Sequence, residues 1–141
     1  MHRLKLQTGS NIVEFAFVMP LLLILVFGII DFSIGLYDKA VITNAAREGA
    51  RTGIVYAKAR LTKEQVEQVV TNYLNGRLIT FGEAIADPTA TFTPDRGNGN
   101  QQSGDTLTVT VDYQYDYVMI ARLFPSLGSL QIRATSVMRV E

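Results

Sequence analysis

Glu14 has the most distinctive chemical setting in the chain, because it is the only charged side chain between Lys5 and Asp31. The sixteen residues from Phe15 to Ile30 that follow it contain no charge. Placing an ionisable group near hydrocarbon costs about 2.5 to 3.5 kcal/mol even on the gentler insertion scales, so such a group usually has a function. A carboxylate in this setting needs a cationic partner, and the apolar run that follows it contains none.

The overall composition argues against several classes of function. The 141 residues carry 13 basic and 13 acidic side chains, so the chain lacks the basic field that attracts nucleic acid. There is no cysteine and His2 is the only histidine, which argues against a thiolate or His-rich metal site and a His-based triad. The sequence also lacks a phosphate-binding Gly-Lys-Ser/Thr loop and a Gly-x-Ser-x-Gly elbow. We therefore expect no enzyme, no metal and no cofactor.

Residues 1–9 and the apolar run together predict one membrane-spanning helix. The 19 residues from Ile12 to Ile30 would form a helix of about 28 Å, which is long enough to cross a bilayer. Arg3 and Lys5 precede this run and no acidic residue accompanies them. The positive-inside rule therefore predicts a cytoplasmic N-terminus and an exported C-terminal part.

Two ordinary kinds of membrane segment explain this region incompletely. A secretory signal peptide would end in a small-x-small cleavage site, whereas here Asp31, Phe32 and Ser33 follow the run and the helical pattern continues. An uncleaved signal anchor explains the length and the orientation. It does not explain a glutamate two residues inside the start of the segment, or a basic leader that ends in Gly9.

Gly9, Ser10, Glu14 and Phe15 together resemble the start of the type IV prepilin class. In that class a membrane prepilin peptidase cuts the leader after a glycine, and a glutamate is the fifth residue of the mature chain. The resemblance implies a cut between Gly9 and Ser10, which makes Glu14 the fifth residue. The new α-amine of Ser10 would be largely protonated, since its reference pKa is about 7.7 to 8.0. In an apolar filament core it would neutralise Glu14 of a neighbouring subunit and set the register between the two.

Three separated motifs narrow this resemblance to one family. They are Glu-Phe-Ala-Phe-Val-Met-Pro-Leu-Leu-Leu at 14–23, Phe-Gly-Ile-Ile-Asp-Phe at 27–32 and Thr-Asn-Ala-Ala-Arg-Glu-Gly-Ala-Arg at 43–51. In this order they are similar to the TadE-like family of pilin-like or minor pseudopilin components of the Tad (tight-adherence) pilus system. The resemblance implies a minor pseudopilin of the bacterial cytoplasmic (inner) membrane whose C-terminal domain is periplasmic or extracellular. The implied partners are other pilin or pseudopilin subunits, the prepilin peptidase and the inner-membrane assembly platform.

The helical pattern continues past the membrane segment. Apolar and small residues recur at spacings of three and four, which predicts one helix from Ser10 to about Ala57. Small residues let helices approach closely, so the stripe of Gly28, Asp31 and Gly35 is suited to packing against another subunit. The other residues expected to shape the packing or the surface of this helix are Pro20 as a kink, Arg47 and Glu48 on a polar side, and Gly49 at a close approach of the globular part.

The remaining chain predicts a small α+β domain of pilin-like fold. Thr62 and Gln65 form a capping box that begins a second helix, which we expect to end by about Gly82. From Asp87 onward the apolar period changes to two, which predicts strands ending at Pro94, over 106–117 and over 130–139. Three antiparallel strands with one apolar face would pack on the two helices. The expected organisation is a leader (1–9), a long helix (10–57, spanning the membrane over about 12–30) and an exported domain (58–141).

Two loops complete the domain. The loop of residues 95–105 contains Asp95, Asn98, Asn100 and Asp105, but Gly97 occupies the third ligand position of an EF-hand, so we do not expect calcium. The less polar connection of residues 119–128 is expected to cover the sheet edge, and the alternative is an apolar contact with a neighbour.

Two other classes of function compete with a pilin-like subunit. One is an uncleaved bitopic module that anchors in the membrane and scaffolds other envelope proteins; its chain would begin at Met1 and not at Ser10. The other is an exported hydrolase, which would need a convergent acid, base and nucleophile that the sequence does not display.

Overall fold

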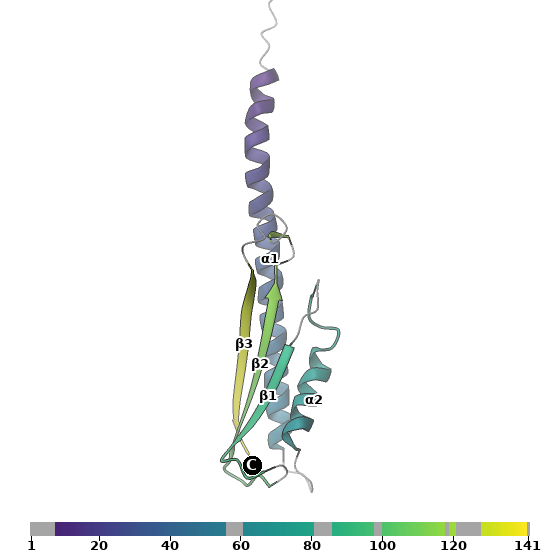
Figure 1. Cartoon of the computed structure of the whole chain (residues 1–141), viewed down its shortest axis with the longest axis vertical. Helices are drawn as coiled ribbons and strands as arrows, with labels where there is room; N and C mark the ends of the chain where they lie inside the picture. Colours follow the sequence, from purple (N-terminus) through teal and green to yellow (C-terminus); the bar gives the residue numbers. More distant parts are fainter. Residues whose placement is uncertain are drawn as a thin grey trace, which may run out of the picture.

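The computed structural model describes residues 8–55, 61–80, 86–97, 100–117, 119–120 and 128–140, except the side chains of residues 8–10. The described elements are α1 (Thr8–Ile54), α2 (Lys63–Leu74), β1 (Ala86–Thr93), β2 (Thr106–Asp116) and β3 (Ser129–Arg139). Figure 1 shows the sheet and α2 lying beside the C-terminal half of α1, while the N-terminal half of α1 extends beyond them. This α+β architecture confirms the fold class predicted from the sequence.

α1 is one helix of 47 residues, or about 70 Å at the usual helical rise, and it continues through Pro20. Its two halves differ in their surroundings. Residues 11–23 are exposed, whereas from Asp31 onward buried residues recur on one side of the helix. These are Asp31, Asp38, Ile42, Ala45, Ala46, Gly49, Ala50 and Gly53. The N-terminal half of α1 is therefore an apolar helix that the described residues leave largely uncovered, and the C-terminal half belongs to the core of the domain.

α2 begins as predicted, with a complete capping box. The Thr62 side chain accepts a hydrogen bond from the backbone N–H of Gln65, and the Gln65 side chain accepts one from the backbone N–H of Thr62. The helix ends at Leu74, which is earlier than the expected end near Gly82. Gly76 has φ +71°, in the left-handed region that an ordinary helical residue does not adopt, so the chain leaves the helix here.

The three strands form one antiparallel sheet in the order β1-β2-β3. Ala90 pairs with Val109 across β1 and β2, and Val111 pairs with Ala134 across β2 and β3. This register places the buried apolar residues of all three strands on the face that packs against the helices, as the alternation in the sequence predicted, while Val137 of β3 is exposed. Tyr113 and Tyr115 of β2 are the largest fully buried side chains.

Glycines allow α1 to approach the rest of the domain closely. A Cβ atom built on Gly49 would lie 2.4 Å from Cγ2 of Val70 in α2. One built on Gly53 would lie 2.4 Å from Cδ2 of Leu107 in β2. Contacts under about 3 Å do not occur between real side-chain carbons, so the close packing of the three elements depends on these glycines.

Candidate functional site

The first candidate region is the free half of α1, which begins with Glu14 and Phe15. Both residues are exposed, and Phe15 retains 63% of its accessible surface. None of the described residues forms an ion pair with Glu14. The apolar side chains that follow are also uncovered, with Phe17 78% and Leu21 70% exposed. The most hydrophobic window of this helix has no buried residue and is long and apolar enough for a single-pass membrane anchor.

The second candidate region is the point where α1 meets the domain, and Asp31 lies at its centre. This residue is only 1% exposed. Its carboxylate accepts hydrogen bonds from the backbone N–H groups of Met119 (3.1 Å) and Ile120 (2.8 Å), which follow β2. The hydroxyl of Tyr115 donates to the Asp31 carbonyl oxygen at 3.1 Å. Asp31 therefore fastens the end of the sheet nearest the free half of α1 to the helix.

Within one chain, the stripe of Gly28, Asp31 and Gly35 lies beside the chain's own domain. A Cβ atom on Gly28 would lie 3.5 Å from Ile120, and one on Gly35 would lie 3.7 Å from Tyr115. Both are ordinary contact distances. Local helical periodicity does not reveal which neighbour covers a stripe, so packing of these residues against another subunit stays a prediction.

Asp38 is a buried residue that the sequence reasoning did not single out. It lies two turns after Asp31 on the same side of α1 and is fully buried. Its carboxylate accepts hydrogen bonds from the backbone N–H of Ile79 (3.0 Å) and from the Tyr113 hydroxyl (3.2 Å). Burial raises the pKa of Asp38 above its ordinary value, and the two hydrogen bonds oppose that shift only in part. The seven-residue spacing of the two aspartates was the signal that pointed to a shared buried face.

Because the pKa of Asp38 is higher in the folded than in the unfolded chain, this group favours folding most at pH values below the ordinary aspartate pKa. That contribution is lost as the pH rises through the raised value in the fold. In Asp38→Asn the amide oxygen can still accept from the Ile79 N–H, and the amide NH2 group can donate to the Tyr113 hydroxyl oxygen in place of the present bond. We therefore expect this variant to gain stability relative to the parent chain at neutral pH. This advantage should shrink as the pH falls, when the parent carboxyl is protonated.

Asp38→Ala is the matched control, because it leaves the Ile79 N–H and the Tyr113 hydroxyl without their acceptor and should cost about 1 to 3 kcal/mol. Urea unfolding of the full chain in detergent micelles, followed by tyrosine fluorescence from pH 4 to 8, measures both effects. A pH-independent difference between the parent chain and Asp38→Asn would contradict the assignment.

The polar side of α1 near its C-terminal end is a solvated surface. Arg47 is exposed, and the Glu48 carboxylate pairs with the Arg51 guanidinium at 2.7 Å. Arg51 also holds the pKa of Glu48 below its ordinary value. Exposed pairs of this kind contribute little to stability, so they suit a soluble face of the helix.

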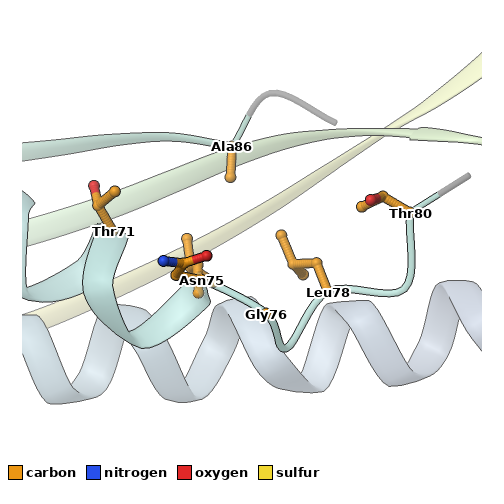
Figure 2. Close-up of a pocket in the computed structure, with 7 residues that line it drawn as sticks. Thr71, Asn75, Gly76, Leu78, Thr80 and Ala86 are labelled. Carbon is orange, nitrogen blue, oxygen red and sulfur yellow. The ribbon is translucent and has the colours of Figure 1, made fainter. Parts of the chain in front are cut away.

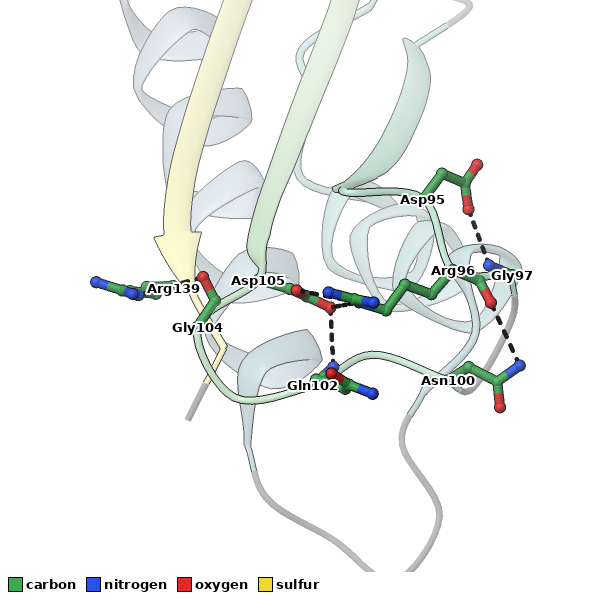
Figure 3. Close-up of polar contacts among 8 residues, drawn as sticks. All are labelled: Asp95, Arg96, Gly97, Asn100, Gln102, Gly104, Asp105 and Arg139. Atoms are coloured by element: carbon green, nitrogen blue, oxygen red, sulfur yellow. Dashed lines mark hydrogen bonds and ion pairs between the residues drawn. The ribbon is translucent and has the colours of Figure 1, made fainter.

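The loop after β1 is closed by its own polar residues, as Figure 3 shows. Asp95 pairs with Lys63 of α2 at 2.7 Å, and Asp105 pairs with Arg96 at 3.1 Å. The two carboxylates considered for calcium thus bind different cationic side chains. Asn98, the third candidate, lies outside the described residues, and no group of three metal-ligating side chains occurs among the residues that are described.

A hollow of about 350 Å³ lies between the end of α2, the turn that follows it and the start of β1 (Figure 2). It is lined by Thr71, Leu74, Asn75, Gly76, Leu78, Thr80 and Ala86. None of these side chains is charged or nucleophilic enough to suggest catalysis.

Fold and site together define an α+β protein in which one long helix is a core element of the domain and has a free half that is long and apolar enough for a single-pass membrane anchor. Residues 9–51 match the family model described as TadE-like protein. This range includes Glu14, the two buried aspartates Asp31 and Asp38, and the glycines Gly28 and Gly35. The match covers the free half of α1 and most of the half packed on the domain. The TadE-like family implies a pilin-like structural component associated with the Tad pilus. No curated protein and no solved structure matches the chain.

Proposed function

We propose that this chain is a pilin-like subunit that is cut between Gly9 and Ser10 by a prepilin peptidase and acts as a minor pseudopilin in Tad pilus assembly for surface adherence. The observation that carries the proposal is the position of Glu14. It is an exposed carboxylate at the start of an uncovered apolar helix, within the segment that matches the TadE-like family, and no described residue pairs with it.

Cleavage would supply the missing partner. The new Ser10 amine would lie four residues before Glu14 on the same helix, a spacing that also permits a pair within one chain. We propose that the pair forms between chains. An amine of one subunit and the carboxylate of the next would neutralise each other when apolar helices pack together. The pair would then fix the axial position of each subunit in the assembly.

The proposed function also implies where the protein is located and which partners it meets. Before assembly the subunit would be held in the bacterial inner membrane by α1, with its N-terminus in the cytoplasm and its domain outside. Its partners would be the prepilin peptidase, the inner-membrane assembly platform and other pilin or pseudopilin subunits. Loss of Arg3 and Lys5 with the leader would leave 13 − 2 = 11 basic against 13 acidic side chains.

Processing is tested by the intact mass and the N-terminal sequence of the chain from membranes that contain the peptidase. We expect the parent chain to begin at Ser10, and Gly9→Leu, which replaces the small residue before the cut, to retain the leader. Gly28→Ala is the control, since it also alters a helix glycine but leaves the leader unchanged. A parent chain that begins at Met1 in the presence of the peptidase would contradict the proposal and favour an uncleaved anchor.

A further inference from the structure

The exposed apolar surface of α1 does not end where the uncharged run of the sequence ends. Asp31 closes that run, but its carboxylate is buried against the domain. Beyond it, Phe32 is 68% and Leu36 55% exposed. Asp38 is buried as well, so the first exposed charge after Glu14 on this helix is Lys39. The intervening helix is about 36 Å long, slightly more than the roughly 30 Å hydrocarbon core of a bilayer.

The start of β3 extends this apolar surface sideways. Leu130 is 46% exposed, and it lines a groove of about 310 Å³ together with Phe32 and Leu36. Lys39 and Arg133 line the same groove, and the Lys39 ammonium donates a hydrogen bond to the Arg133 carbonyl oxygen. On α1, Phe32 and Leu36 lie nearer the membrane anchor than Lys39 does. On β3, Leu130 likewise lies nearer the anchor than Arg133, which follows three residues later.

The backbone at this end of the sheet is prepared for an apolar environment. Ile120 reaches the level of Gly28, with 3.5 Å between its Cδ1 atom and a Cβ built on the glycine. A free N–H group at such a depth would be costly, because hydrocarbon offers no hydrogen-bond acceptor. Asp31 accepts from the N–H groups of both Met119 and Ile120. The clasp thus satisfies these two N–H groups within the molecule.

We propose that the membrane-proximal end of the domain rests in the bilayer itself. In this arrangement lipid acyl chains cover the base patch of Phe32, Leu36, Met119 and Leu130. Lys39 and Arg133, whose guanidinium pairs with Asp112, lie at the level of the phosphate groups. Long basic side chains commonly reach the headgroup layer while their aliphatic stems stay in apolar surroundings. The inference rests on the anchoring role of α1 in the proposed function, and the patch is continuous with the surface of that anchor.

Single-cysteine labelling can test this arrangement cleanly, because the chain contains no cysteine. Leu130→Cys, Leu22→Cys and Val137→Cys would each carry an environment-sensitive nitrobenzoxadiazole label. The full chain would be reconstituted in phosphatidylcholine/phosphatidylglycerol vesicles with less than one chain per vesicle. Val137 is the matched control, because it is exposed on the same strand as Leu130 but lies toward the far end of the domain. Quenching by shallow spin-labelled lipids, which report on Leu130, by deep spin-labelled lipids, which report on Leu22, and by aqueous iodide would then be compared.

We expect the Leu130 label to be quenched by the lipid probe and several-fold less by iodide than the Val137 label. Leu36→Cys, on the helix side of the groove, should behave like Leu130→Cys and guards against a local effect of either substitution. If the Leu22 label is quenched by lipid while iodide quenches the Leu130 label as strongly as the Val137 label, this inference is wrong and the proposed membrane anchoring is unaffected. If the Leu22 label is not quenched, the membrane anchoring itself is wrong. Shielding of Leu130 that appears only at high protein-to-lipid ratio would show that a second copy covers the patch, which also overturns the inference.

Discussion

Glu14→Ala is expected to insert into the membrane normally and to be lost from the assembled pilus. The substitution leaves the apolar run untouched, so the anchor keeps its length and its hydrophobicity. In an assembly, however, it would leave the Ser10 amine of a neighbouring subunit buried without a counter-charge. Removing one partner of a buried ion pair typically costs about 3 to 5 kcal/mol, which corresponds to roughly a 10²- to 10³-fold loss, or more, in an association constant.

The measurement compares the amount of the subunit in the membrane fraction with the amount in sheared pili. Asn11→Ala is the matched control, because Asn11 is also exposed and lies one turn before Glu14 on the same helix. Glu14→Asp tests the charge with a shorter side chain and should restore part of the incorporation. Normal incorporation of Glu14→Ala would rule out the pairing with the Ser10 amine. The family match would remain, but the proposed ion pair between subunits would not explain how they assemble.

Gly49→Ala is expected to destabilise the domain, although alanine is the better helix former. The added methyl group would lie 2.4 Å from Cγ2 of Val70, which is fully buried and whose branched side chain cannot swing away. Overpacking of this kind costs about 1 to 3 kcal/mol and occasionally more. The gain in helix propensity, at most about 1 kcal/mol, offsets only part of it. A larger residue such as leucine at this position should prevent folding.

Gly35→Ala is the matched control in the same helix. Its methyl group would lie 3.7 Å from Tyr115, an ordinary contact, so the helix propensity should dominate and the chain should be as stable as the parent or more so. Urea unfolding of the full chain in micelles, followed by tyrosine fluorescence, measures both variants. Equal stability of Gly49→Ala and Gly35→Ala would show that α2 is less tightly packed on α1 than the structure indicates.

Much of this fold was predictable because the signals are local. The period of three to four residues along α1, the capping box of Thr62 and Gln65, and the alternation along β2 each arise from side chains a few residues apart. Their elements therefore appear in the structure where the sequence predicted them, within a few residues. The end of α2 was missed because several later apolar residues, such as Leu78, continue the stripe, whereas the left-handed conformation of Gly76 stops the helix.

Local residue patterns were likewise enough to suggest the family. Gly9, Ser10, Glu14 and Phe15 suggested the prepilin class, the motifs at 14–23, 27–32 and 43–51 suggested the TadE-like family, and the family match covers residues 9–51. The chemistry proposed for these residues acts between subunits. In the fold of one chain Glu14 is exposed, so its pairing with the Ser10 amine of a neighbour stays a prediction.

The sequence could not reveal what the buried side of α1 touches. Asp31 contacts a backbone 88 residues away, and Asp38 contacts a hydroxyl 75 residues away. The same spacing of glycines and aspartates would suit a neighbouring subunit equally well, because periodicity states only that a face is covered. The tertiary structure chooses between these possibilities. Met119 and Ile120 cover the Asp31 carboxylate, Ile79 and Tyr113 cover that of Asp38, and Phe32 and Leu36 stay exposed beside the free half of α1.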